Sequence, residues 1–249
     1  MARARGTRRR AGTIGRVKTA ALLIVGDEVL SGEVRDENGP YLIGRLSDLG
    51  TRVQRMVVVP DRMEVIVADL RALRASVDLV VTSGGIGPTH DDLTRQAVAE
   101  ALGVPLVRHD DAVSKVRRWY PADATSSEMT MADLPAGSRL LRGARTDTLG
   151  FCVAGVYVLP GVPFLLRDLV EGSLDEFRGP PLHREEVRTD RREGEIAPAL
   201  TRVQAASLDV AIGSYPIADG RRWWTKVVVR GSDAARVAAV AAELRGTIV

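Results

Sequence analysis

A glycine-rich segment followed by two acidic residues is the part of the sequence best suited to chemistry. It reads Gly84-Gly85-Ile86-Gly87-Pro88-Thr89-His90-Asp91-Asp92-Leu93-Thr94. It follows a predicted strand and opens a predicted helix, where glycines allow close approach to the backbone and free N–H groups attract an anion. The segment lacks the Gly-Lys-Ser/Thr of a Walker loop. A tight turn with Thr89 as the helix N-cap and Asp92 closing a capping box is an equally good interpretation of the pattern.

The charge beside these glycines favours a metal–phosphate site over a bare anion site. Asp91 and Asp92 would repel a phosphate unless a hard cation lay between them. Mg²⁺ is held in this way, through one or two carboxylates together with substrate phosphates. Two further acidic positions, Glu28 and Asp61, follow the first and second predicted strands. We expect these acidic loops to lie at one edge of one sheet.

The elements that would position these loops alternate between strand and helix. The first six are strand 20–25, helix 41–49, strand 53–59, helix 65–75, strand 78–81 and helix 93–102. A further helix over 113–119, a strand over 153–159 and a helix over 164–174 follow. This alternation predicts an α/β fold with a mostly parallel sheet covered by helices on both faces. Ligands on such sheets bind beyond the carboxyl ends of the strands.

A second, smaller α+β domain is predicted after a linker rich in glycine and proline. Its expected elements are strand 186–189, helix 196–206, strands 210–215 and 223–230, and helix 234–244. The predicted organisation is therefore a basic tail over 1–18, a large α/β domain over 19–176, a linker over 177–182 and the small domain over 183–249.

Composition excludes several classes of protein. Of the 249 residues 45% are hydrophobic and 27% are charged, which is typical of a globular protein. No apolar run approaches the ~18 residues of a membrane span, and no signal peptide is recognised, so we expect a cytoplasmic protein without membrane contacts. The single cysteine, Cys152, excludes an intramolecular disulfide framework, and its apolar neighbours predict a buried structural thiol.

The formal net charge of +3 comes from the first eighteen residues, which hold seven basic residues and no acidic one. Without those seven, 28 basic residues stand against 32 acidic ones, so the rest of the chain is at −4. A nucleic-acid-binding protein is expected to carry its positive charge on a folded face. We therefore interpret the tail as a disordered, solvated extension and do not expect nucleic acid to be a partner.

Several motifs in sequence order resemble one known family. They are GDEVLSG (26–32), NGPYL (38–42), Pro60-Asp61, GGIGPTHDDLT (84–94) and LPGVP (159–163). Together they resemble the molybdopterin-binding (MoaB/Mog) domain family, and most closely the N-terminal part of CinA-type competence/damage-inducible proteins and the similar domain of eukaryotic FAD synthases. The resemblance covers about residues 19–175.

Residues 183–249, with GSYP at 213–216, resemble the small KH-type domain that follows in CinA-type proteins. They contain no GxxG loop, so clamping of nucleic acid by this module is not expected. The sequence stops at Val249, before the nicotinamide-nucleotide amidase domain that usually follows, and we expect no amidase activity.

The resemblance implies a three-layer αβα fold that binds a pterin or a nucleotide pyrophosphate with a divalent metal such as Mg²⁺. It gives Asp61 and Asp92 as the catalytic aspartates and Asp91, Asp92 and Glu28 as metal ligands. The implied substrate- and phosphate-binding residues are Gly84, Gly85, Gly87, Pro88, Thr89, Thr94, Pro160, Gly161 and Pro163. The chain departs from the CinA pattern at 147–150, where Asp-Thr-Leu-Gly replaces Asn-x-x-Gly.

Three functions fit these observations. The first is metal-dependent hydrolysis of a nucleotide pyrophosphate such as ADP-ribose or FAD, with Asp61 as the candidate base for an attacking water. The second is binding of molybdopterin, with or without its adenylylation, in molybdenum cofactor biosynthesis. The third is a non-catalytic ligand-binding protein. The CinA-like second domain favours the first, while the resemblance and the Trp223–Trp224 pair suggest a homodimer.

Overall fold

The computed structural model describes residues 17–120, 124–220 and 222–249. The predicted tail lies outside the described residues except for its last two positions, and the final one, Lys18, already belongs to the first strand. The chain forms two compact units, one spanning Lys18–Gly179 and the other containing Pro180–Val249. Each unit is described by itself.

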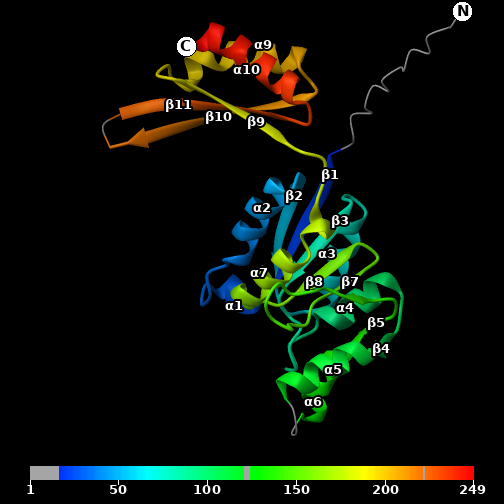
Figure 1. The fold of residues 1–249 in the computed structure, drawn as a ribbon. Coiled ribbons are helices and arrows are strands. Elements are labelled where there is room, and N and C mark those ends of the chain that lie inside the picture. The colour runs from blue at the N-terminus through cyan, green and yellow to red at the C-terminus, as the bar shows by residue number, and fades with distance from the viewer. Residues whose placement is uncertain (1–16, 121–123, 221) are drawn as a thin grey trace, which may run out of the picture. The chain divides into compact units, whose positions relative to one another are not determined.

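A six-stranded sheet in the order β2-β1-β3-β8-β7-β6 forms the centre of the large unit (Figure 1). Neighbours among the first four strands pair in parallel, whereas β7 and β6 pair antiparallel at one edge. The strands are β1 (Lys18–Val25), β2 (Thr51–Val59), β3 (Leu79–Ser83), β8 (Val156–Leu159), β7 (Phe151–Val153) and β6 (Arg139–Leu140). The predicted mostly parallel sheet is confirmed.

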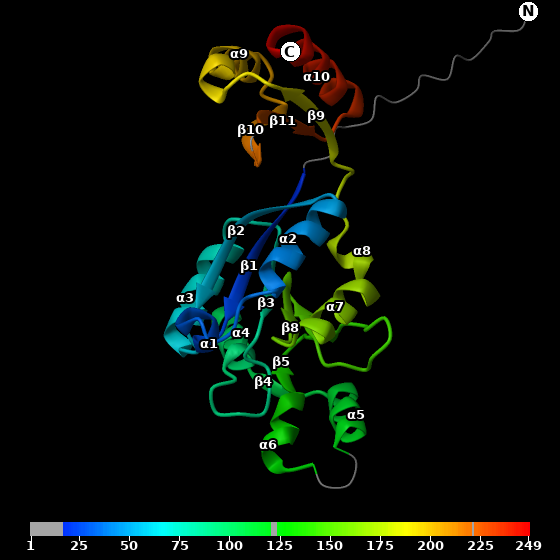
Figure 2. The same cartoon turned by 90° about the vertical axis from the view of Figure 1, so that its left-hand side faces the viewer.

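Helices cover both faces of this sheet. The helices α2 (Asn38–Asp48) and α7 (Pro163–Gly172) lie on one face and α3 (Met63–Arg74) and α4 (Thr94–Leu102) on the other (Figure 2). Side chains alternate along β1, so Leu22 packs toward α2 and α7 while Leu23 packs toward α3 and α4. The predicted αβα layering is confirmed.

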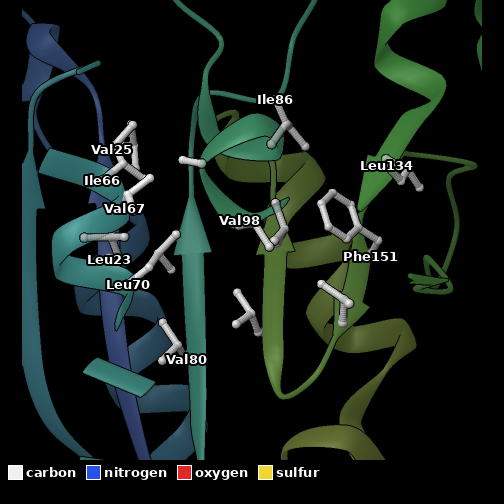
Figure 3. Close-up of a cluster of buried hydrophobic side chains, with 14 of the residues drawn as sticks. Leu23, Val25, Ile66, Val67, Leu70, Val80, Ile86, Val98, Leu134 and Phe151 are labelled. Carbon is white, nitrogen blue, oxygen red and sulfur yellow. The ribbon is translucent and has the colours of Figure 1, made fainter. Parts of the chain in front are cut away.

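The core on the α3/α4 face is continuous and aliphatic. Figure 3 shows the side chains of α3 and α4 meeting those of β1, β3 and the neighbouring strands, and Leu70 and Phe151 are completely buried there. Burying apolar surface of this kind is the main favourable contribution to folding. It makes the strand ends a rigid support for the loops that follow them.

The described residues of 106–135 form short elements. They are β4 (Leu106–Arg108), α5 (Asp110–Trp119), α6 (Ser126–Met129), the 3₁₀ turn η1 (Thr130–Ala132) and β5 (Asp133–Pro135), which pairs with β4. In addition, residues expected in a loop after β1 form the short helix α1 (Asp27–Ser31).

The linker begins later than predicted. Phe177, its expected first residue, ends the short helix α8 (Leu174–Phe177) and is completely buried. Its ring lies 4.9 Å from that of Tyr157, centroid to centroid, so it belongs to the core of the large unit. The Gly-Pro-Pro run that predicted the linker lies just after it.

The small unit has every element that the sequence predicts. Its strands β9 (His183–Thr189), β10 (Val210–Asp219) and β11 (Arg222–Gly231) form an antiparallel sheet in the order β10-β11-β9. The helices α9 (Glu193–Ala206) and α10 (Ala234–Ile248) pack on one face of this sheet. Across all residues that the structure describes, no helix is long and apolar enough to cross a membrane.

Leu70→Ala tests the core beneath the site. Because Leu70 is completely buried, we expect the substitution to lower the free energy of unfolding by about 2–5 kcal/mol in denaturant titrations. Leu30→Ala, at a half-exposed position of the same unit, serves as the control and should cost less than about 0.5 kcal/mol. Equal losses in the two variants would contradict the described packing.

Candidate functional site

A cavity of about 510 Å³ lies where the parallel strands of the large unit end. Val25 is the last residue of β1, Asp61 follows β2, Gly84 follows β3 and Pro160 follows β8, and all four line the cavity. The topology therefore brings together loops that are far apart in the sequence, at the edge that a parallel sheet offers to ligands.

One part of the cavity wall is acidic. Its carboxylates belong to Glu28, Asp61, Asp91 and Asp92. Asp61 is also fixed in the loop structure, since its Oδ2 accepts a hydrogen bond of 2.8 Å from the backbone N–H of Asp27 at the start of α1. The pKa of Asp61 is raised, and burial is the largest cause. The hydrogen bond from Asp27 lowers this pKa, whereas the negative charges of Glu28, Asp27 and Asp91 raise it further. Negative charge is thus concentrated where the strands end.

Two of the glycines of this wall are required by its geometry. Gly84 has φ of +102°, and a Cβ there would lie 2.2 Å from the carbonyl oxygen of Val25. Gly85 has φ of +67°, and its Cβ would lie 2.4 Å from Oγ1 of Thr94. Gly161 lies next to Gly84, and a Cβ on it would make only an ordinary van der Waals contact, 3.4 Å from the Gly84 Cα. Glycine is therefore required at positions 84 and 85, where a side chain would collide and the backbone has positive φ.

Thr94 supports the glycine loop from behind. Its side chain is completely buried, and Oγ1 donates a hydrogen bond of 2.8 Å to the carbonyl oxygen of Gly84. Its backbone N–H, at the start of α4, donates to the carbonyl oxygen of Gly85 at 2.9 Å. The residue therefore positions the loop and does not line the cavity. The first N–H of this helix is also taken, contrary to the expectation of a free donor for an anion.

The capping-box interpretation of this segment is wrong. The helix α4 begins only at Thr94, and Leu93 occupies its N-cap position. Oδ2 of Asp92 accepts hydrogen bonds from the backbone N–H of Thr89 at 2.9 Å and from its hydroxyl at 2.5 Å. These bonds close a turn before the helix, so Thr89 faces Asp92 and does not line the cavity.

Two predicted phosphate-binding prolines also lie off the wall. Pro163 is the first residue of α7, and the residues before it, Gly161 and Val162, line the cavity in its place. Pro88 is likewise absent from the lining. Nine of the predicted site residues do line the cavity, namely Glu28, Asp61, Gly84, Gly85, Gly87, Asp91, Asp92, Pro160 and Gly161.

Arg95 fixes the far end of the glycine loop and was not predicted. Its side chain is buried, and its guanidinium donates to the carbonyl oxygen of Gly87 at 2.9 Å and to that of Thr130. Burial lowers the pKa of this guanidinium, an effect that the charges of Asp92 and Asp133 oppose. No local pattern in the sequence distinguishes this arginine from a surface one on α4.

Asn38, the first residue of α2, joins two of the loops. Its side chain is buried, and Nδ2 donates to Oγ of Ser83 at 2.9 Å and to the carbonyl oxygen of Gly161 at 2.6 Å. The amide therefore connects the end of β3 with the loop before α7. Asn38 is the first residue of the NGPYL motif, so the sequence marked this position, but it did not predict what the side chain does.

Another part of the cavity wall is mainly apolar and was also missed. It is formed by Val116, Trp119, Tyr120, Met131, Leu149, Val162 and Leu165. The i, i+3, i+4 spacing of Val116, Trp119 and Tyr120 was the available signal; the first two lie on α5 and Tyr120 follows its last residue. Such a wall suits a flat ring system, whereas the acidic wall suits oxygen-rich groups.

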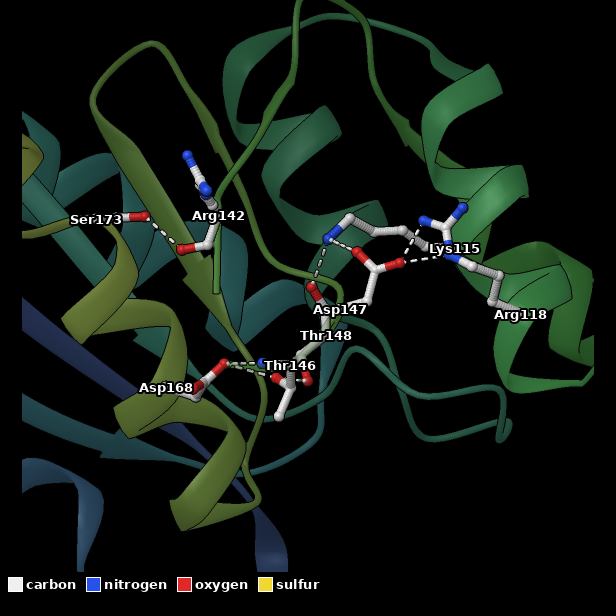
Figure 4. A network of polar contacts seen from close by, with 8 residues as sticks. All are labelled: Lys115, Arg118, Arg142, Thr146, Asp147, Thr148, Asp168 and Ser173. Carbon is white, nitrogen blue, oxygen red and sulfur yellow. Dashed lines mark hydrogen bonds and ion pairs between the residues drawn. The ribbon is translucent and has the colours of Figure 1, made fainter. Parts of the chain in front are cut away.

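A polar network crosses the edge of the apolar wall (Figure 4). Nζ of Lys115 lies 2.8 Å from Oδ1 of Asp147 and donates to the carbonyl oxygen of Thr148 at 3.1 Å. Asp147 also contacts Arg118, and contacts with both cations hold the pKa of its carboxyl below the usual range. Lys115, Asp147 and Thr148 line the cavity, whereas Arg118 does not. The ammonium group of Lys115 therefore lies within reach of a ligand.

Asp168 of α7 anchors the loop that carries this network. Its carboxylate is buried and accepts hydrogen bonds from the backbone N–H groups of Arg145 and Thr146, each at 2.9 Å. The hydroxyl of Thr146 donates to it at 2.6 Å (Figure 4). The loop therefore has a fixed position against the core.

The donor set of the acidic wall fits a hard divalent cation. Carboxylate oxygens are the ligands that Mg²⁺ prefers. In the part of the chain that the structure describes, no three His, Cys, Asp or Glu side chains come close enough to form a complete metal site. Mg²⁺ is commonly held by one or two carboxylates plus substrate phosphates, so this wall fits a cation that shares its ligands with a phosphate.

Comparison with known proteins identifies both units. Residues 21–179 match the family described as a probable molybdopterin binding domain. The chain belongs to the molybdopterin-binding domain family. Residues 181–248 match the middle domain of FAD synthase, so this family member carries a second recognised domain.

Relatives place the chain in the CinA-like branch of the family. A protein of Archaeoglobus fulgidus is 31% identical over 198 residues, which covers 78% of this chain and 84% of the relative. A CinA-like protein of an Anaeromyxobacter species is 40% identical over 157 residues, 60% of this chain and 38% of that protein. The crystal structure of CinA from Thermoplasma acidophilum, of unknown function, matches with a TM-score of 0.61 and 32% identity, over 65% of this chain and 98% of that one.

Gly84→Ala tests the close packing of the glycine loops. The added methyl group would collide with the carbonyl oxygen of Val25, so we expect thermal and denaturant unfolding to report a loss above about 3 kcal/mol. Gly103→Ala is a matched control, because Gly103 also has positive φ, of +68°, but open space around its Cβ position. It should cost only about 1–2 kcal/mol. Similar losses in both variants would argue against the close approach.

Proposed function

We propose that this chain is a divalent-metal-dependent hydrolase of a nucleotide pyrophosphate of the ADP-ribose or FAD type. The observation that carries this proposal is a single cavity with two kinds of wall, one of acidic side chains and bare glycine backbone and the other of apolar side chains. A nucleotide pyrophosphate has the same two parts, a charged diphosphate and a flat base.

The volume and the charge of the cavity support this substrate class. About 510 Å³ falls within the range of small-molecule sites and exceeds what a lone phosphate needs. The acidic wall would repel a diphosphate alone, so the ligand and a cation are expected to enter together. The match of the second unit to the middle domain of FAD synthase favours a nucleotide over a simple pterin.

The proposed reaction is attack of water on one phosphorus atom, with cleavage of the bond from that phosphorus to the bridging oxygen. A divalent cation held by one or two of the carboxylates of Asp91, Asp92 and Glu28, together with the substrate's own phosphates, would polarise the phosphoryl oxygens. Asp61, whose pKa is raised, is the candidate acceptor for the proton of the attacking water. Backbone N–H groups of the glycine loop would stabilise the charge that develops on the phosphoryl oxygens. From ADP-ribose the products are AMP and ribose phosphate.

Molybdopterin binding, with or without its adenylylation, is the second candidate. The description of the matching family favours it, and the apolar wall would accept a pterin as readily as a purine. Tight binding of molybdopterin without turnover of any dinucleotide would select this candidate over hydrolysis. A ligand-binding protein without catalysis would in addition bind nucleotides equally well in EDTA.

A homodimer is part of the same proposal. Trp223 is 70% exposed, so it does not pack in the core of its own unit. Its ring is therefore free to contact a second copy of the chain. Light scattering on the eluted protein would distinguish one copy of 26.8 kDa from two.

Asp92→Asn tests the proposed chemistry. Hydrolysis of ADP-ribose with Mg²⁺ should fall about 100-fold or more, since the substitution removes a proposed metal ligand, and EDTA should abolish wild-type turnover. Asp48→Asn, at an exposed position at the end of α2, is the control and should retain wild-type rates. Equal rates for Asp92→Asn and wild type would refute the proposal.

Asp61→Asn separates the proposed catalytic role of Asp61 from its role in the loop. Because its folded-state pKa is raised, the stability contributed by protonated Asp61 is complete below the ordinary pKa of about 3.9 and is lost as pH rises through the raised value. Asparagine mimics the protonated form and retains an acceptor for the N–H of Asp27. At pH 7 we expect an equal or higher melting temperature and about 100-fold less hydrolysis.

The stability advantage of Asp61→Asn should shrink when melting temperatures are compared at pH values near 3. Asp61→Ala, which lacks the acceptor, should melt below the asparagine variant at pH 7. A lower melting temperature for Asp61→Asn than for wild type at pH 7 would contradict the electrostatic assignment.

A further inference from the structure

The sheet of the small unit has one face that its helices do not cover. Strand register gives the composition of this face, because side chains alternate between the two sides. Lys226 of β11 lies beside Tyr215 of β10 and Arg188 of β9, and Arg230 lies beside Arg184 of β9. Val227 and Val229, at the alternating positions, pack into the core against α9 and α10. We call the uncovered side the open face, with its principal residues Arg184, Glu186, Arg188, Tyr215, Trp224, Lys226 and Arg230.

Aromatic rings and cations are interleaved on the open face. The Cζ of Arg188 lies 4.2 Å from the ring centroid of Trp224. Nζ of Lys226 lies 5.8 Å and Cζ of Arg230 lies 6.0 Å from the ring centroid of Tyr215. The side chains of Arg188, Arg230 and Tyr215 are exposed, so this arrangement is accessible to solvent.

The charge on the open face is strongly positive. Among its principal residues, four cationic side chains stand against one carboxylate, that of Glu186, which forms an ion pair with Arg184. At the far end of β10 and β11 the same register adds one carboxylate and one cation, Asp219 opposite Arg222. Two copies of this face brought together would place like charges opposite one another, which is unfavourable. The complementary partner is therefore a polyanion, and the rings add a requirement for flat groups that can stack on them.

We propose that the open face binds single-stranded nucleic acid. Bases would stack on Trp224 and Tyr215 while phosphates contact Arg188, Lys226 and Arg230, the combination used by proteins that bind single strands without strict sequence preference. A double helix could place phosphates against the cationic side chains. Its bases could not stack on the aromatic rings, because they are already stacked on one another inside the duplex. The sequence led us to expect no nucleic acid as a partner. That expectation was formed without the strand register, which places these residues on one side of the sheet.

The test is fluorescence anisotropy of a labelled twelve-nucleotide oligo-dT with the full chain. The basic tail is present in every variant and so contributes equally. Lys226→Gln and Arg230→Gln should each weaken binding and reduce the slope of log affinity against log salt by about one. Arg202→Gln, at an exposed position of α9 away from the open face, removes the same charge and should leave both values near those of wild type.

Trp224→Leu and Tyr215→Leu test the stacking. Each should weaken binding about fivefold or more, and a hairpin duplex of similar charge should bind wild type less tightly than oligo-dT. Circular dichroism identifies any variant that fails to fold, and the two charge variants then still decide the question. Any one of three results would overturn the proposal. They are no binding by wild type, equal losses of affinity in Arg202→Gln and Arg230→Gln, and unchanged affinity in both folded leucine variants.

Discussion

Repulsion between carboxylates is the constraint on which the large unit depends. Glu28, Asp61, Asp91 and Asp92 line one cavity beside loops of bare backbone, and burial together with neighbouring charge raises the pKa of Asp61. Such an arrangement costs stability in the empty protein. Strained or repulsive groups persist where the surrounding structure fixes them and where a ligand relieves them. In the proposed function, a cation that arrives with a diphosphate provides this relief.

The surrounding structure fixes these groups through buried polar side chains that do not touch the cavity. Thr94 and Arg95 hold the two ends of the glycine loop by its carbonyl groups, and Asn38 ties the loop before α7 to the end of β3. Asp168 holds the loop that carries Asp147, the ion-pair partner of Lys115 on α5. Each of these contacts joins residues to an element of the packed core, so the cavity walls inherit the rigidity of the sheet.

The sequence predicted the fold well because its patterns are local. Alternating apolar runs and helical stripes gave the parallel sheet, and the acidic residues after β1, β2 and β3 gave the acidic wall. Contacts between distant segments were not predictable in the same way. Arg95 looks like any helical arginine until Gly87 and Thr130 are placed beside it. Thr89 was interpreted as an N-cap from its spacing to Asp92, although the apolar pattern itself predicted a helix only from residue 93, close to the observed start at Thr94. The apolar wall was missed because its residues come from α5, η1, the segment before β7 and the start of α7, which the sequence does not place together.

The most direct test of this account is calorimetric binding of ADP-ribose to the Asp61→Asn variant, which is expected to bind without rapid turnover, in Mg²⁺ and in EDTA. The account predicts tight binding with Mg²⁺ and a loss of about tenfold or more in EDTA, because the remaining carboxylates then repel the diphosphate. Equal affinity in the two buffers would contradict it.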